Sequence, residues 1–197
     1  SPCPPSIASP AMDLSIIVPT FNEGPNVDEL LQRIGDALDG RVFEVIFVDD
    51  STDDTPAIVT AAAATAPFPV RLIHRENADA GLGGAVVAGF QAATSRWCLV
   101  MDGDLQHPPE DIPRLVERAE RGDVDVVIAS RYASGGTSKG LADATRTAVS
   151  RASTALTKAM FPRKLTNCSD PMTGFFLVDR SALEVETLQP RGFKILL

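Results

Sequence analysis

Short runs of apolar residues alternate along this chain with segments in which apolar residues recur every three or four positions. Runs of the first kind are typical of buried strands, and segments of the second kind are typical of amphipathic helices. The predicted strands lie at residues 14–18, 45–48, 70–74, 97–101 and 124–129, and the predicted helices at residues 26–38, 55–66, 84–93 and 111–121. This repeated order predicts an α/β fold, with a mostly parallel sheet and helices on both faces.

Three of the predicted helices carry local signals. The first has five apolar residues on one face, at Val27, Leu30, Leu31, Ile34 and Leu38. Thr55 is predicted to cap the second, with Pro56 in its first turn. Before the third, the glycine-rich segment 81–84 lacks the spacing of a phosphate-binding loop or a dinucleotide-binding turn. We therefore interpret it as the turn that starts the helix.

The two ends of the chain follow other patterns. Residues 1–12 are rich in Pro, Ser and Ala and are predicted to be a flexible tail, which leaves residues 13–197 as one domain. The later predicted elements are a glycine-rich segment over 133–141, a helix over 144–160, a turn over 170–174 and a short strand over 175–178. The final apolar run leaves open whether a further C-terminal segment, such as membrane helices, follows.

The composition narrows the classes of partner. A net charge of −8 argues against nucleic acid as the main partner, although a metal ion and a few arginines can still hold an anionic substrate. No run reaches the roughly 18–20 apolar residues of a membrane span, and no signal peptide is apparent. Three cysteines without a CxxC pair favour a reducing compartment. We therefore expect a cytoplasmic location.

Polar residues gather where the predicted strands end. The clusters are Pro19–Glu23, Asp49–Ser51, Asp102–Asp104 and Ser130–Tyr132. In open parallel sheets the carboxyl ends of the strands share one edge, and ligands bind outside it. Taken alone, Asp49 and Asp50 fit a simple strand-end turn equally well. Together the clusters predict an acidic ligand site that also contains Arg131.

The most informative cluster consists of Asp102 and Asp104, which flank Gly103 directly after an apolar strand. In extended backbone, residues i and i+2 project to the same side, roughly 6–7 Å apart. Two carboxylates can then converge on one hard divalent cation, with Gln106 as a third oxygen ligand. The glycine lets a ligand approach the backbone. Mg²⁺ or Mn²⁺ here would stabilise the charge on the diphosphate leaving group of a nucleotide sugar.

Six segments, in order, resemble family 2 glycosyltransferases of the GT-A fold, and most closely the dolichyl-phosphate mannose synthase group. They lie at residues 17–23, 48–51, 101–110, 130–132, 170–176 and 192–196. The resemblance implies a Rossmann-like GT-A sheet and a glycosyltransferase catalytic domain over residues 13–197. It also implies a metal-dependent, inverting transfer of a hexose from a nucleotide sugar to a polyprenyl or dolichyl phosphate.

The same resemblance implies roles for individual residues. The donor base and ribose are expected against Pro19, Phe21, Glu23, Val48 and Asp50, with Gly103 also at the substrate. The metal ligands are expected to be Asp102, Asp104 and Gln106, and the residues facing the acceptor phosphate Arg131, Arg146 and Ser150. The two aspartates and the two arginines are the expected catalytic residues. A surface ion pair for Arg131 and an exposed helix face for Arg146 are the alternatives.

A lipid phosphate is already anionic near neutral pH, so we expect it to attack the sugar without a general base. The sequence of residues 106–109 resembles that of mannosyl-transferring relatives more than that of glucosyl-transferring ones. GDP-mannose is therefore the expected donor, with UDP-glucose as the alternative. Three features depart from the family pattern. Gly103 stands where the family usually has alanine, which we expect to be tolerated. The loop over 50–54 is one residue shorter, and residues 78–84 lack a lysine often found there.

Rival functions fit the sequence less well. A phosphatase of the haloacid dehalogenase type would carry its acidic pair on the first strand. A nucleotidylyltransferase would have a glycine-rich basic loop where this chain has Pro19–Glu23. The sequence does not exclude a non-catalytic sugar-nucleotide binding domain.

Basic residues over 146–164 fit a membrane surface or a solvated face equally well. Because the acceptor lies in a bilayer, we expect peripheral binding at the cytoplasmic face of a membrane.

Overall fold

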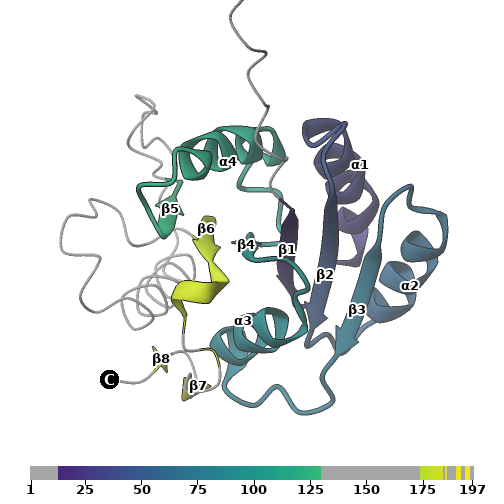
Figure 1. Cartoon of the computed structure of the whole chain (residues 1–197). Helices are drawn as coiled ribbons and strands as arrows, with labels where there is room; N and C mark the ends of the chain where they lie inside the picture. Colours follow the sequence, from purple (N-terminus) through teal and green to yellow (C-terminus); the bar gives the residue numbers. More distant parts are fainter. Residues whose placement is uncertain (1–12, 130–173, 184, 186–189, 192–193, 196–197) are drawn as a thin grey trace, which may run out of the picture.

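The computed structural model describes residues 13–129, 174–183, 185, 190–191 and 194–195 (Figure 1). Within them, six strands form one sheet in the order β3-β2-β1-β4-β6-β5. The strands are β1 (Leu14–Thr20), β2 (Phe43–Asp49), β3 (Val70–His74), β4 (Trp97–Val100), β5 (Val126–Ile128) and β6 (Phe176–Asp179), and a separate ladder joins β7 (Pro190–Arg191) to β8 (Lys194–Ile195). Strands β1 to β4 are parallel, and β6 is antiparallel to β4 and β5. The predicted, mostly parallel α/β fold is confirmed.

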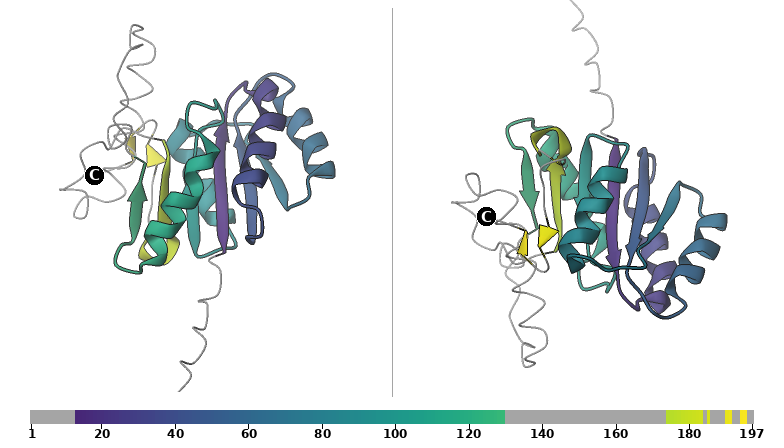
Figure 2. Two further views of the ribbon diagram at one scale, coloured as in Figure 1. Left: turned by 90° about the horizontal axis from the view of Figure 1, so that it is seen from above. Right: turned by 90° about the horizontal axis from the view of Figure 1, so that it is seen from below.

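Helices cover both faces of the sheet, as the two views in Figure 2 show. Helices α1 (Val27–Ala37), α2 (Thr55–Thr65) and α4 (Ile112–Glu120) pack on one face, and α3 (Gly81–Ala92) packs on the other. The 3-10 turns are η1 (Gly24–Asn26), η2 (Pro109–Asp111) and η3 (Arg180–Ala182). No helix in the described ranges is long and apolar enough to cross a bilayer.

Strand β1 lies in the interior of the sheet, and all seven of its residues are buried. Ile16 and Val18 contribute to the core under α1, whereas Ile17 contributes to the core under α3. Burial on both faces explains why the middle of this strand, Ile16–Val18, is a continuous apolar run instead of an alternating one. The five apolar residues predicted to form one face of the first helix are all buried against the sheet.

Helix α3 packs closely on β1 at Gly89. A Cβ atom at this position would lie 2.3 Å from Ile17 Cγ2 and 3.0 Å from Ile17 Cγ1. Both groups lie in the core, so we expect Gly89→Ala to lower the free energy of unfolding by about 1–3 kcal/mol, despite the better helix propensity of alanine. Urea denaturation measures this difference. An unchanged free energy of unfolding would show that α3 moves away from β1 without cost.

Two helix starts differ from the predicted ones. Thr55 does not cap α2: the cap residue is Asp54. The Thr55 hydroxyl instead accepts a hydrogen bond from the Gly24 N–H at 2.9 Å, and so connects η1 to α2. Helix α3 begins at Gly81 rather than Gly84, directly after Ala80 in the left-handed conformation (φ 64°). The glycine-rich segment is therefore a helix start, as interpreted from the sequence.

Strand β1 also continues through Pro19 to Thr20, beyond its predicted end. Ile17 O accepts from Met101 N, and Thr20 O accepts from Asp50 N. Alternate residues thus face β4 and β2, and Pro19 faces the β4 side, where β4 has already ended. Its missing N–H therefore costs no ladder hydrogen bond. The predictions for residues 1–12, 133–141, 144–160 and 170–173 fall outside the described residues.

Candidate active site

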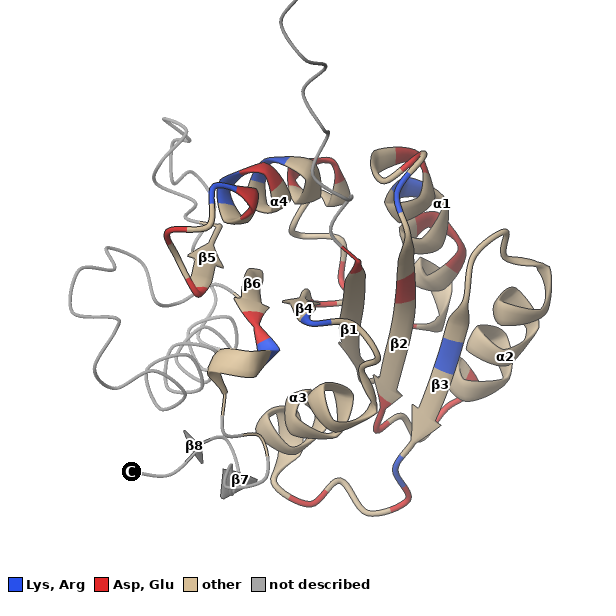
Figure 3. Ribbon diagram, in the orientation of Figure 1, with Lys and Arg blue, Asp and Glu red and all other residues tan. Residues whose placement is uncertain are grey.

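The ends of the parallel strands bring the predicted acidic clusters to one edge of the sheet. Thr20 pairs with Asp49 in the register of β1 and β2, and Asp49 pairs with His74 in the register of β2 and β3. Asp102 follows Met101 directly after β4. Acidic residues at the end of β2 and in the loop after β3 can be followed in Figure 3. Residues that are far apart in the sequence therefore surround one edge.

Asp49 is fully buried and connects three strand ends. Its Oδ1 atom accepts hydrogen bonds from Thr20 Oγ1 at 2.9 Å and from Ser51 Oγ at 2.5 Å. Its Oδ2 atom shares a hydrogen bond with His74 Nδ1 at 2.8 Å and accepts from Ser51 N at 3.2 Å. Since both oxygens are used within the protein, Asp49 supports the edge of the sheet, and Asp50 is the member of the pair closer to solvent.

The turn after β1 is fixed by Asn22, which sequence reasoning did not single out. Asn22 has left-handed backbone (φ 57°), its N–H donates to Ser51 Oγ at 2.8 Å, and its Oδ1 accepts from Thr52 N at 3.0 Å. This turn leaves Phe21 60% exposed, while Glu23 lies against the acidic strand ends. An exposed phenyl ring beside the carboxyl ends of the strands offers a flat apolar surface on which a nucleobase can stack.

The other predicted donor residues differ in exposure. Pro19 and Val48 are buried, so a donor would meet their backbone atoms. Asp50 is engaged by Arg75, whose Nε and Nη2 donate to the two carboxylate oxygens at 2.7 and 2.5 Å. Arg75 was missed by sequence reasoning because a lone arginine after a strand belongs to no local motif.

Glu23 packs directly over Gly103. A Cβ atom on residue 103 would lie 2.3 Å from Glu23 Oε2 and 3.0 Å from Thr20 Cγ2. Glu23 Oε2 is buried and has no hydrogen-bond partner within the described residues. Burial, together with the charges of Asp104 and Asp102, raises the pKa of Glu23 to about 8. Burial in the first place, and the neighbouring negative charges in the second, therefore keep a proton on this carboxyl group near neutral pH.

The two aspartates of the predicted metal motif are held by different neighbours. The Asp104 Oδ1 atom accepts from Gln106 N at 3.0 Å, across Leu105 in the left-handed conformation (φ 59°). The Asp102 carboxylate lies against Gly174, where a Cβ atom would be 2.4 Å from Oδ2 and 2.8 Å from Cγ and Oδ1. Gln106 is exposed. Gly174 is thus a site residue by contact, with no chemistry of its own.

These residues fit a divalent cation by donor type and by charge. Carboxylate and amide oxygens are the ligands that hard cations prefer, and the charges of Asp104 and Asp102, which add to the effect of burial on the pKa of Glu23, are charges that a cation would offset. Within the described ranges no group of three or more His, Cys, Asp or Glu is placed to hold a metal ion. A site made of Asp102, Asp104 and Gln106 would supply three side-chain oxygens, so an octahedral cation there would take its other ligands from water or substrate.

The raised pKa of Glu23 makes stability depend on pH. In the unfolded chain this carboxyl ionises near 4.5, whereas in the folded protein it keeps its proton up to about 8. The metal-free protein therefore loses stability as the pH rises through this window. The free energy of unfolding of Glu23→Gln should therefore rise by about 1–3 kcal/mol relative to that of wild type as the pH increases through this window. Urea denaturation in EDTA measures the difference. A constant difference between the two proteins would contradict the expectation.

The predicted acceptor residues Arg131, Arg146 and Ser150 lie outside the described residues. The structure describes the chain up to Ala129, two residues before Arg131. The N–H of Ala129, at the end of β5, donates to Phe175 O at 3.0 Å. Phe175 directly follows Gly174, which contacts Asp102. Ala129, the last described residue before Arg131, thus pairs with the residue that follows Gly174.

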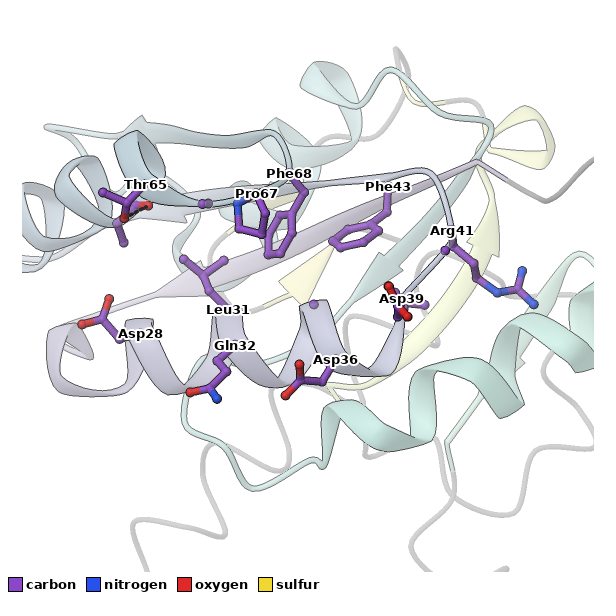
Figure 4. Close-up of a pocket in the computed structure, with 15 residues that line it drawn as sticks. Asp28, Leu31, Gln32, Asp36, Asp39, Arg41, Phe43, Thr65, Pro67 and Phe68 are labelled. Atoms are coloured by element: carbon purple, nitrogen blue, oxygen red, sulfur yellow. Dashed lines mark hydrogen bonds between the residues drawn. The ribbon is translucent and has the colours of Figure 1, made fainter.

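A cavity of about 720 Å³ lies elsewhere, between α1, α2 and the beginning of β2 (Figure 4). Phe43 and Phe68 lie in its wall, with their ring centroids 4.6 Å apart. None of the predicted site residues lines it. Phe43 is the first residue of β2, whereas the candidate residues follow the last residues of the strands, so this cavity is separate from the candidate site.

Comparison with known proteins identifies related sequences. The profile of Glycosyl transferase family 2 matches residues 15–186. The dolichol-phosphate mannosyltransferase of Pyrococcus furiosus is 38% identical over 94% of this chain and 51% of its own length. The protein of the same name from Saccharomyces cerevisiae is 36% identical over 95% of this chain and 69% of its own length. The chain thus spans about half to two thirds of the length of these relatives.

Solved structures agree on the fold. A glucosyl-3-phosphoglycerate synthase from Mycobacterium tuberculosis is 22% identical, with a TM-score of 0.64 over 93% of this chain and 62% of that chain. A mannosyltransferase from Pyrobaculum calidifontis, solved with GDP-Man and Mn²⁺, is 30% identical, with a TM-score of 0.53 over 59% of this chain and 35% of that chain. The fold is of the GT-A type. Because the family profile and the sequence relatives both cover most of the residues, this chain belongs to glycosyl transferase family 2.

Proposed function

We propose that residues 13–197 are the catalytic domain of a metal-dependent, inverting glycosyltransferase that moves mannose from GDP-mannose onto a polyprenyl or dolichyl phosphate. The observation that carries the proposal is the acidic edge of the sheet, where Asp102 and Asp104 follow β4 and Glu23 packs over Gly103. Its relatives support the acceptor class. Besides the dolichol-phosphate mannosyltransferases, they include undecaprenyl-phosphate 4-deoxy-4-formamido-L-arabinose transferases at 38% and 40% identity. These names share a polyprenyl phosphate and differ in the sugar.

In this proposal Asp102, Asp104 and Gln106 hold Mg²⁺ or Mn²⁺. The ion, when bound, stabilises the negative charge of the departing diphosphate. The protein prepares the place for it: the turn from Asp104 to Gln106 is closed by a hydrogen bond, and Gly103, which has no Cβ, lets the Glu23 carboxyl group lie between the two aspartates and β1.

The acceptor needs no general base in this chemistry. A lipid phosphate carries negative charge near neutral pH, and its oxygen attacks the anomeric carbon from the side opposite the diphosphate, which inverts that centre. Arg131 and Arg146, with Ser150 nearby, are proposed to orient this phosphate, since planar guanidinium groups bond its oxygens in pairs. Catalysis then depends on alignment and on stabilisation of charge.

Phe21 and Asp50 are proposed to bind the nucleoside of the donor. Phe21 offers an exposed ring for stacking, and Asp50 offers carboxylate oxygens that accept from N–H or O–H groups. The mannosyltransferase solved with GDP-Man and Mn²⁺ supports GDP-mannose as the first choice, with UDP-glucose as the alternative. Since a polyprenyl phosphate presents its charge at a bilayer surface, we propose that the domain works there as a peripheral protein on the cytoplasmic face.

A transfer assay tests the proposal. The protein is incubated with Mn²⁺ or Mg²⁺, a polyprenyl phosphate in detergent, and either labelled GDP-mannose or labelled UDP-glucose. We expect label in the lipid extract from GDP-mannose, its loss in EDTA and its return when Mn²⁺ is added in excess. Label in the lipid extract from UDP-glucose alone would show that UDP-glucose, and not GDP-mannose, is the donor. Nucleotide binding without transfer to any lipid would identify a non-catalytic binding domain and overturn the proposal.

A further inference from the structure

The side chain of Arg75 joins three segments near the proposed donor site, namely the residue after β2, the loop before α3 and the first residue of α3. It donates to both oxygens of Asp50 at 2.7 and 2.5 Å, and also to Asp79 O at 3.1 Å and to Gly81 O at 2.9 Å. Only 14% of the Arg75 side chain and 11% of the Asp50 side chain are exposed. A bidentate contact that is largely shielded from water fixes the orientation of both planar groups. Arg75 therefore determines how the Asp50 carboxylate is presented.

The loop between β3 and α3 closes around this guanidinium group. A Cβ atom on Gly84, in the first turn of α3, would lie 2.6 Å from Arg75 Nη1 and 2.3 Å from Asp79 O. Ala80, in the left-handed conformation, turns the chain into α3 so that Gly81 is its first residue. The beginning of the helix thus depends on the position of the arginine, and the arginine also holds the carboxylate after β2.

We propose that Arg75 is a positioning residue of the donor site, which holds Asp50 in the orientation that binds the donor nucleoside and connects it to the beginning of α3. The inference rests on the proposed function, in which Asp50 contacts the donor. Each Asp50 oxygen accepts one hydrogen bond from Arg75 and keeps a further lone pair. The guanidinium group fixes the direction in which those lone pairs point. Without the arginine, the carboxylate would be free to rotate and to bind water in place of the donor nucleoside.

The chain contains a matched control for this arginine. Arg71, within β3, donates to Glu44 Oε2 through Nε at 3.1 Å and Nη2 at 2.8 Å, and also to Ala92 O at 2.6 Å. Glu44 lies in β2, and Ala92 is the last residue of α3. Arg71 therefore connects β3 to β2 and to the end of α3, whereas Arg75 connects the residues that follow β3 and β2 to the beginning of α3. A purely structural role predicts similar effects for the two arginines.

The experiment compares Arg75→Lys and Arg75→Gln with Arg71→Lys and Arg71→Gln in the full chain. Binding of GDP and UDP with Mn²⁺ is measured by calorimetry, and the free energy of unfolding by urea denaturation. We expect Arg75→Gln to weaken nucleotide binding at least about tenfold. Arg75→Lys should weaken it less, since lysine keeps the charge but not the paired N–H groups. Both Arg71 variants should bind as wild type does, even where they lower the free energy of unfolding.

Two further readouts separate positioning from general damage. In the transfer assay Arg75→Lys should raise the KM for the donor while kcat changes by less than about threefold. In the Asp50→Asn background, Arg75→Gln should add little further loss of binding, because it acts through Asp50. Wild-type affinity in the Arg75 variants, or an equal loss of affinity in the Arg71 variants, would overturn the inference and leave the proposed function intact. A wild-type protein that binds neither nucleotide would overturn both.

Discussion

Asp104→Asn is expected to lower kcat for sugar transfer by at least about a hundredfold while leaving the fold intact. Asparagine keeps an oxygen that can accept the Gln106 N–H, so the turn after β4 persists. What is lost is the negative charge of one proposed ligand of the cation. The metal-free variant should be no less stable than wild type, because one of the charges that raise the pKa of Glu23 is gone.

The measurement combines the transfer assay over a range of Mn²⁺ concentrations with urea denaturation in EDTA. Asp123→Asn is the control, since Asp123 is an exposed aspartate bonded to Arg118 and lies in the turn after α4. It should leave kcat unchanged. Full metal-dependent turnover by Asp104→Asn would show that this carboxylate does not hold the ion.

Gly174→Ala should reduce turnover by about one to two orders of magnitude, although it adds a single methyl group. The added carbon would lie 2.4 to 2.8 Å from three atoms of the Asp102 carboxylate, closer than real contacts allow. The carboxylate is the end of a partly buried side chain, so it can move away from the added carbon without a shift of the backbone. We therefore expect a higher Mn²⁺ concentration for half-maximal activity, with the free energy of unfolding changed by less than about 1 kcal/mol.

A double-mutant cycle shows whether the methyl group acts through Asp102. In the Asp102→Ala background Gly174→Ala should have no further effect on turnover, because the carboxylate that it displaces is absent. If the two losses multiply instead, Gly174 acts elsewhere. If Gly174→Ala binds Mn²⁺ as wild type does, the contact has no bearing on the metal site.

The fold followed from the sequence where burial leaves a local pattern. Every residue of β1 and β2 is buried, so the middle of each strand, at residues 16–18 and 45–48, is a continuous apolar run. The direction of β6 could not be read in this way, because it depends on pairing with β4 and β5, which lie far away in the sequence. The same holds at Thr55, whose hydroxyl is engaged by the distant Gly24 N–H and not by its own helix.

Asp102, Gly103 and Asp104 could be singled out because they are neighbours in the sequence, and their role as a metal site stays a proposal. The contacts of Asn22, Arg75 and Gly174 could not be predicted, since each acts on a residue far along the chain. Asn22 and Gly174 lie in segments that resemble the family, but the sequence does not show what they contact. The structure also gives a reason for glycine at position 103, where the family usually has alanine. Glu23 Oε2 occupies the space in which an alanine Cβ would lie, so the exchange and the position of Glu23 are linked.

The central claim is that a divalent cation bound by Asp102 and Asp104 stabilises the departing diphosphate. A crystal structure with GDP and Mn²⁺ tests it most directly, because anomalous scattering locates the manganese without reference to the protein. We expect one peak between the two carboxylates and the diphosphate oxygens. A manganese ion bound elsewhere on the edge of the sheet, with both carboxylates turned away from the nucleotide, would contradict the claim.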